Sequence, residues 1–216
     1  MSDLTEYAKL VCVNTGSQAN KGFQAVIRLP IYKDLPCEWD YINYYCGLGN
    51  FECGVSTANR AEFKQKGELK WHWFTNTPDG QSSGDTLFAD GTTIPICLER
   101  DANDQVVFQV FGATVYTSLK TFKEYNSQDN PARLILAASQ SSPITDPLLP
   151  WRIRQFQVVA SSMKYKDSSG VWQDMVDASK VTLDHWPKGI TSPPPIDYRI
   201  NVQHLYDARM NAILLF

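Results

Sequence analysis

The sequence "NYYCGLGNFECGV", residues 43–55, places two cysteines symmetrically about a Gly-Asn pair. Two-residue hairpin loops favour glycine at their first position, because glycine adopts a positive φ there without strain. With Gly49 and Asn50 as the loop, Cys46 lies directly opposite Cys53. The stretch therefore predicts an antiparallel β-hairpin, in preference to a metal knuckle or a redox pair.

Strand alternation divides the side chains of this hairpin between two faces. One face is apolar and is predicted to join a core: Ile42, Tyr44, Cys46, Leu48, Phe51, Cys53 and Val55. The other face carries rings, polar groups and two glycines that leave room beside them: Tyr41, Asn43, Tyr45, Gly47, Glu52, Gly54 and Ser56. This second face is a candidate ligand-binding surface, and burial of its tyrosines against a second sheet or a loop is the alternative.

The two hairpin cysteines have three interpretations. A zinc site needs a closer pair and two further ligands, which the neighbouring sequence does not provide. Residues directly opposite on antiparallel strands lie ~5.5 Å apart between Cα atoms, so a disulfide between Cys46 and Cys53 is sterically allowed. We favour two buried free thiols that behave as small apolar side chains, close enough to crosslink.

The rest of the chain repeats the pattern of short strands separated by polar turns. Strand candidates are residues 9–14, 23–30, 68–77, 92–100, 105–119, 132–139, 151–166, 171–175 and 198–206, with 208–216 as a last strand or a short helix. A change of apolar parity predicts a bulge near Gln155, and only residues 4–10 and 118–125 resemble helices. The pattern predicts an all-β protein with minimal helix, an antiparallel two-sheet β-sandwich of the jelly-roll type. We expect a single domain over residues 1–216, with a long surface loop over residues 184–196.

The composition narrows the functional classes. The chain has 216 residues, of which 43% are hydrophobic and 20% charged, as in globular proteins. Its net charge of −3 argues against a nucleic-acid partner. No apolar run is long enough to cross a bilayer, and the first residues lack the pattern of a signal peptide. The compartment stays open between the cytoplasm, export by another route and secretion with the leader removed, and the oligomeric state is not indicated.

Four stretches together resemble the concanavalin A-like lectins and glucanases: "YYCGLGNFECGVS", "LKWHWFTN", "FQVFGATVYTS", and "RQFQVVASSMKY" followed by "VWQDM". The chain is most similar to uncharacterised bacterial members of that superfamily. The resemblance implies a jelly-roll fold and a carbohydrate ligand, bound on a concave sheet face or its rim loops. A shared fold does not by itself establish function.

Catalytic residues are not assigned. Retaining glycoside hydrolysis needs two carboxyl groups about 5 Å apart, and the candidates are Glu38 and Asp40 in "CEWDY" with Glu52 on the next strand. The parts of a polysaccharide lyase are present without the matching spacing: Arg152, Arg154, Gln203, His204 and Tyr206. No metal or cofactor is assigned either, because the Asp-Gly pairs at 79–80 and 90–91 are interpreted as turns, with Ca²⁺ binding as the alternative.

Carbohydrate recognition combines aromatic faces with planar polar side chains in a preformed groove. The candidate ligand-binding residues of these types are Tyr41, Asn43, Tyr45, Glu52, Trp71 and Trp73. The sequence therefore predicts a lectin-like module that binds carbohydrate. The alternatives are a glycan-cleaving enzyme of the same fold, either a glycoside hydrolase or a polysaccharide lyase, and a toxin-like or structural protein that attaches to surfaces.

Overall fold

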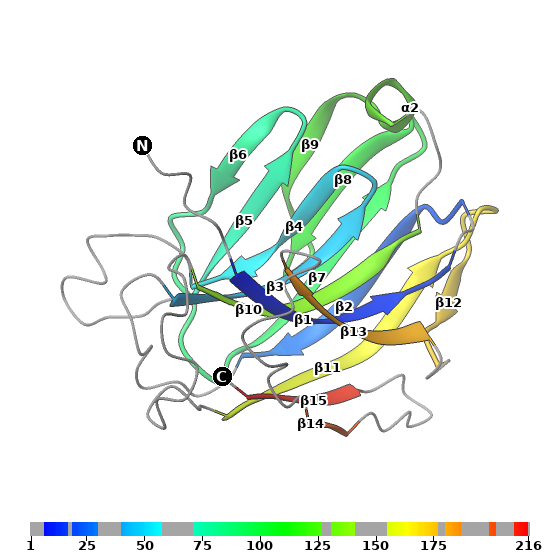
Figure 1. Cartoon of the computed structure of the whole chain (residues 1–216). Helices are drawn as coiled ribbons and strands as arrows, with labels where there is room; N and C mark the ends of the chain where they lie inside the picture. Colours follow the sequence, from blue (N-terminus) through cyan, green and yellow to red (C-terminus); the bar gives the residue numbers. More distant parts are fainter. Residues whose placement is uncertain are drawn as a thin grey trace.

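The computed structural model describes residues 7–16, 19–29, 40–57, 71–126, 131–140, 155–176, 180–186, 199–201 and 210–215. These residues form two antiparallel β-sheets and the short helix α2 (Phe122–Tyr125) (Figure 1). The all-β two-sheet sandwich predicted from alternation and turn chemistry is therefore confirmed.

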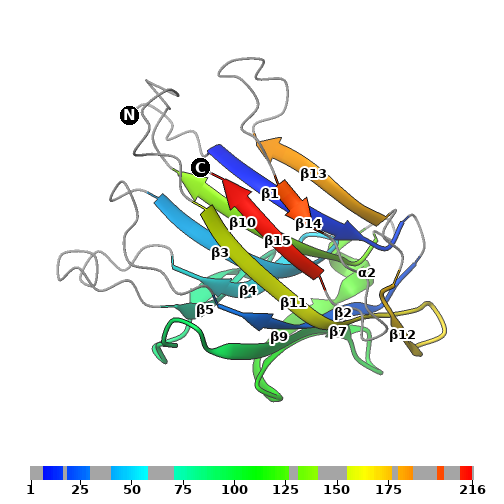
Figure 2. The ribbon, with the colours of Figure 1, turned by 90° about the horizontal axis from the view of Figure 1, so that it is seen from below.

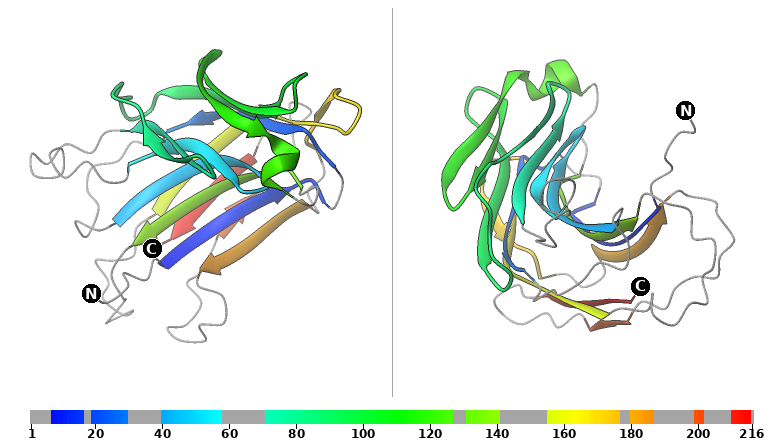
Figure 3. Two further views of the ribbon diagram at one scale, coloured as in Figure 1. Left: turned by 90° about the horizontal axis from the view of Figure 1, so that it is seen from above. Right: turned by 90° about the vertical axis from the view of Figure 1, so that its left-hand side faces the viewer.

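The strands divide into a seven-stranded and an eight-stranded sheet. The first has the order β13 (Val181–Trp186), β1 (Tyr7–Asn14), β10 (Arg133–Gln140), β3 (Asp40–Leu48), β4 (Phe51–Ser56), β5 (His72–Thr77) and β6 (Gly80–Ser83). The second has the order β14 (Arg199–Asn201), β15 (Met210–Leu215), β11 (Gln155–Lys166), β2 (Gly22–Arg28), β7 (Thr93–Arg100), β8 (Gln105–Val110) and β9 (Ala113–Thr121), with β12 (Trp172–Asp174) paired to β11 (Figure 2). Both sheets curve in the same sense, and the right-hand view of Figure 3 shows the seven-stranded sheet on the inside of the arc. The face of the seven-stranded sheet that points away from the eight-stranded sheet is therefore concave.

The hairpin of β3 and β4 has the register that the sequence predicts. Leu48 pairs with Phe51 and Cys46 pairs with Cys53. Gly49, the first loop residue, has a φ of 59°, a conformation that a side chain at this position would strain. A one-residue slip would exchange the two faces of the hairpin, so this register decides which side chains reach the core.

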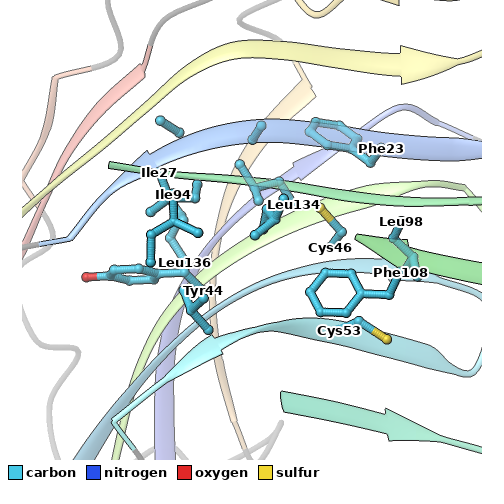
Figure 4. Packing of buried hydrophobic residues seen from close by; sticks show 14 of the residues in the cluster. Phe23, Ile27, Tyr44, Cys46, Cys53, Ile94, Leu98, Phe108, Leu134 and Leu136 are labelled. Atoms are coloured by element: carbon cyan, nitrogen blue, oxygen red, sulfur yellow. The ribbon is translucent and has the colours of Figure 1, made fainter. Parts of the chain in front are cut away.

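The core lies between the two sheets and is built from the predicted apolar face. All seven side chains of that face are fully buried: Ile42, Tyr44, Cys46, Leu48, Phe51, Cys53 and Val55. Figure 4 shows Tyr44, Cys46 and Cys53 packed with Phe23 of β2 and Phe108 of β8, both from the opposite sheet. Burial of each large apolar side chain contributes about 1.5–3 kcal/mol, which makes this interface the main source of stability.

Both hairpin cysteines are free thiols in this core. Burial raises the pKa of Cys46 and that of Cys53 well above the ordinary value, because the low-dielectric core disfavours the thiolate. Cys97 of β7 is less buried, and burial raises its pKa to about 12. The thiolate is the reactive form of cysteine, so the fold itself protects the pair.

We therefore expect an alkylating reagent to leave Cys46 and Cys53 unmodified in the native protein and to label both under denaturing conditions. Cys12, whose side chain is partly exposed, serves as the internal control and should react earlier. Peptide mass spectrometry after timed labelling measures the order. Early labelling of Cys53 would contradict its place in the core.

Several predicted boundaries are wrong. β11 has its bulge between Ser161 and Lys164, where Ser162 has a φ of 50°, whereas a bulge was predicted near Gln155; from Gln155, the first described residue, to Ala160 the pairing with β15 is regular. Residues 7–10 belong to β1, and only Phe122–Tyr125 of the stretch 118–125 is helical. β13 continues to Trp186, three residues into the stretch assigned to a surface loop; residues 187–196 of that loop lie outside the described residues.

The stretch 105–119, expected as one strand, is a second tight hairpin. It divides into β8 and β9 at Phe111 and Gly112, whose φ angles are 53° and 75°. Two-residue turns with positive φ usually carry Asn-Gly or Asp-Gly. Because Phe111 occupies the first position, a search for those residue pairs does not detect this turn.

Candidate functional site

The concave face of the seven-stranded sheet carries the polar and aromatic face of the β3–β4 hairpin. The register aligns side chains in rows across β10, β3, β4 and β5. One row is Ile135, Tyr45, Gly54 and Phe74, and the next is Arg133, Gly47, Glu52 and Asn76. Five residues of these rows, together with Asn43 two positions before Tyr45 in β3, form what we call the concave site: Asn43, Tyr45, Glu52, Phe74, Asn76 and Arg133.

Tyr45 and Phe74 meet across Gly54. Gly54 stands between them on the middle strand, and the two ring centroids are 5.9 Å apart in an edge-to-face arrangement. A Cβ at Gly54 would clash with the backbone of Tyr44 and Tyr45 and lie 2.5 Å from the Tyr45 Cβ, so glycine is required where β4 passes β3 beside the ring pair. Both rings are half-buried and present a partly exposed aromatic pair.

Glu52 and Arg133 meet across Gly47 in the same way. Nη2 of Arg133 lies 3.2 Å from Oε1 of Glu52, and Nδ2 of Asn76 donates a hydrogen bond of 3.4 Å to Oε2. A Cβ at Gly47 would lie 2.6 Å from Nε of Arg133, which shows that the guanidinium lies over this glycine. The pair is half-exposed, so its net contribution to stability is small and its groups remain available to a ligand.

The floor of the site is buried and polar. Ser56 donates a hydrogen bond from its hydroxyl to Oδ1 of Asn43, and Ser56 pairs across the strands with His72. Ser56 and His72 are 2% and 5% exposed, whereas Asn43 is half-buried. The concave face thus opens from this floor towards Glu52 and Asn76 near the β3–β4 turn.

The predicted site residues fall into three groups. Asn43, Tyr45 and Glu52 lie on the concave face. For Tyr41 and Asp40 the structure describes only the backbone, paired with Ser139 and Gln140 of β10. Other candidates lie outside the described residues: Glu38, Arg152, Arg154, Gln203, His204 and Tyr206.

The structure places Trp71, one of the two tryptophans predicted to bind ligand, in the core and away from the concave face. Its side chain is fully buried, stacks on Tyr44 with a centroid distance of 5.3 Å, and donates its indole N–H to Asp90 at 3.1 Å. Trp73 shares the parity of Trp71 and packs against the core. Apolar alternation in this strand points the tryptophans inward, and it is His72 and Phe74 that face the concave side.

The two Asp-Gly pairs form turns, with a φ of 121° at Gly80 and 75° at Gly91. Both aspartates are engaged by protein donors: Asp79 by two tyrosine hydroxyls, Asp90 by the indole of Trp71. Within the described ranges, no cluster of three or more His, Cys, Asp or Glu side chains could hold a metal ion. None of the helices described there is long and apolar enough to cross a membrane.

Three residues of the site were not predicted: Phe74, Asn76 and Arg133. Phe74 and Asn76 follow from alternation once Trp71 is assigned to the core. Arg133 belongs to β10, which pairs with β3 although 85 residues separate Gly47 from it, and no local pattern signals that pairing.

No protein-family model matches the chain, and none of the curated protein sequences does. Solved structures do resemble it. Scytalido-glutamic peptidase with a transition state analog inhibitor has a TM-score of 0.57 at 7% identity, over 96% of this chain and 97% of that one. SCP-B, a member of the eqolisin family of peptidases in complex with the tripeptide Ala-Ile-His, has a TM-score of 0.55 at 6% identity, with the same coverage.

The chain shares the two-sheet jelly-roll fold of these peptidases over nearly its whole length. A laminarinase from Flavobacterium sp. UMI-01 overlaps 66% of this chain and 71% of its own at 12% identity, with a TM-score of 0.39. Identities this low establish the fold alone, and the predicted jelly roll is confirmed in that sense. Function has to be argued from the concave site.

Proposed function

We propose that this protein is a lectin-like module that binds carbohydrate on the concave face of its seven-stranded sheet. The observation that carries the proposal is the pair of contacts across Gly54 and Gly47. They set an aromatic pair, Tyr45 and Phe74, beside an ion pair with an amide donor. Sugars are recognised by this combination, because rings pack against C–H faces while planar polar groups bind hydroxyls.

The state of Glu52 supports binding in preference to cleavage. Each of its two carboxylate oxygens has a protein donor, Arg133 on one and Asn76 on the other. A carboxylate held in this way is a fixed hydrogen-bond acceptor, with lone pairs left for the hydroxyl of a sugar. This arrangement serves recognition of a hydroxyl, which needs a fixed acceptor and no proton transfer.

A glycan array with the purified full chain tests the proposal. We expect capture of one class of oligosaccharide and no release of reducing ends from it. Glu52→Gln should weaken that binding by about tenfold, since a charge-assisted hydrogen bond is replaced by a neutral one. Loss of measurable turnover with unchanged affinity would instead identify Glu52 as a catalytic carboxyl group.

A peptide ligand is the second candidate, favoured by the likeness to glutamic peptidases over nearly the whole chain. A concave sheet face accommodates an extended peptide as well as a glycan. A peptide-library digestion at acidic and neutral pH, analysed by mass spectrometry, separates the two. Cleavage that Glu52→Gln abolishes, with no binding on the glycan array, would replace the carbohydrate proposal.

A further inference from the structure

The β5–β6 hairpin carries two residues of the concave site, Phe74 and Asn76, but it lies at the edge of its sheet. Among the described strands, β6 pairs only with β5, and all four of its residues are exposed. Gln81 of β6 adds one polar link, donating a hydrogen bond of 3.3 Å to Asn76. β5 is held along its other side by β4, whereas β6 and the β5–β6 turn extend beyond that pairing. A two-stranded ribbon is only marginally stable by itself, so the turn end of this hairpin depends on the contacts of its turn.

The turn is held by Asp79, whose carboxylate receives three donors from the other side of the sandwich. The hydroxyl of Tyr116 donates at 2.6 Å and the backbone N–H of Leu119 at 2.9 Å, both to Oδ2. The hydroxyl of Tyr125 donates to Oδ1. Tyr116 and Leu119 belong to β9 and Tyr125 to α2, so one side chain connects the edge of the concave sheet to the edge of the second sheet.

The ionisation of these groups agrees with the geometry. Partial burial alone would raise the pKa of Asp79, but the bonds from Tyr116, Tyr125 and Leu119 outweigh it and hold that pKa below its ordinary value. The hydrogen bond to Asp79 raises the pKa of Tyr125 to about 12. The carboxylate is therefore charged and both hydroxyls are protonated at neutral pH, the arrangement that gives strong charge-assisted hydrogen bonds.

The donors are themselves fixed to the hairpin that carries Tyr45 and Glu52. The rings of Tyr116 and Tyr125 pack on Phe51, with centroid distances of 6.4 Å and 5.6 Å. Asn126, directly after α2, accepts a hydrogen bond of 3.0 Å from the backbone N–H of Asn50 in the β3–β4 turn. Through these contacts, Asp79 connects the turn of the β5–β6 hairpin to the turn end of the β3–β4 hairpin (Figure 1).

We propose that Asp79 is a positioning residue: it anchors the β5–β6 hairpin so that Phe74 and Asn76 meet Tyr45 and Glu52 in the concave site. The consequence for ligand binding rests on the proposed function. The anchoring does not, because it concerns contacts within the chain.

The first test is amide hydrogen exchange of the Asp79→Ala variant. We expect amides of β5 and β6 to exchange at least about tenfold faster than in the wild type, while those of the buried strands β2 and β7 keep their rates. Tyr125→Phe and Tyr116→Phe each remove one donor and should give smaller increases confined to the same hairpin. Unchanged rates in β5–β6, or an equal increase in every strand, would overturn the anchoring.

Asp167→Ala is the matched control. Asp167 also organises a hairpin turn through its carboxylate, accepting bonds from Ser169, Val171 and Gln173, but it does so at β11–β12 in the other sheet. The Asp167→Ala variant should accelerate amide exchange in the β11–β12 hairpin and leave the exchange rates of β5 and β6 unchanged.

The second test measures position without any ligand. Nuclear Overhauser contacts between the rings of Tyr45 and Phe74 should be present in the wild type and in Asp167→Ala, and lost or strongly weakened in Asp79→Ala. Retained ring contacts in Asp79→Ala would refute a positioning role.

The same variants on the glycan array then test the link between anchoring and ligand binding. Capture by the wild type and Asp167→Ala but not by Asp79→Ala supports that link. Equal capture by all three refutes that link. No capture by any of them counts against the carbohydrate proposal and leaves the exchange result standing.

Discussion

Replacing Trp71 by alanine is expected to lower the free energy of unfolding by about 3–5 kcal/mol. The indole is fully buried, stacks on Tyr44 and donates its N–H to Asp90. Truncation removes its apolar contacts, leaves a cavity that the surrounding strands cannot fill, and deprives Asp90 of a donor. Denaturant titration followed by far-ultraviolet circular dichroism measures the loss.

Leu119→Ala is the control, because Leu119 is 81% exposed and its truncation should change stability by less than about 0.5 kcal/mol. Trp71→Phe should lie between the two, since it keeps a ring in the core and loses the hydrogen bond. If Trp71→Ala were as stable as the wild type and failed to bind glycans, the tryptophan would be a ligand contact after all.

The architecture was predictable where it depends on short-range patterns. The β3–β4 register follows from one glycine with a positive φ and from period-2 alternation, and both are local properties of residues 41–56. The core face of that hairpin followed from the same information. The β8–β9 turn is equally local, but Phe111 occupies a position where the usual turn residues are Asn or Asp, so the pattern was absent.

The candidate site was predictable only in part, because it is assembled from strands distant in the sequence. Tyr45 and Glu52 were placed correctly on a shared face. Their partners Phe74 and Arg133 come from β5 and β10, and the register of those strands is set by pairing across long connections. The glycines at 47 and 54 were recognised as leaving room, but the residues that use this room could be known only from the neighbouring strands.

Replacing Tyr45 by alanine is expected to remove most of the binding on the glycan array while leaving the fold intact. Tyr45 is half-buried on the concave face and contacts Phe74, so its ring contributes more to an incoming sugar than to the core. Loss of a central aromatic contact typically costs about 2 kcal/mol or more of binding free energy, roughly thirtyfold in affinity. The loss of stability should stay near the ~0.5–1.5 kcal/mol of one aromatic pair.

Trp172→Ala is the matched control for that experiment. Trp172 is also a half-buried aromatic residue, but it lies in β12 of the other sheet beside Lys166, away from the concave face. It should bind glycans as the wild type does. Phe74→Ala should reproduce the defect of Tyr45→Ala, and the double variant should lose little more than either single one, because each change already breaks the shared ring contact. A large fall in melting temperature for Tyr45→Ala with glycan binding retained would mean that the aromatic pair stabilises the sheet, and that the ligand contacts other residues of the concave face.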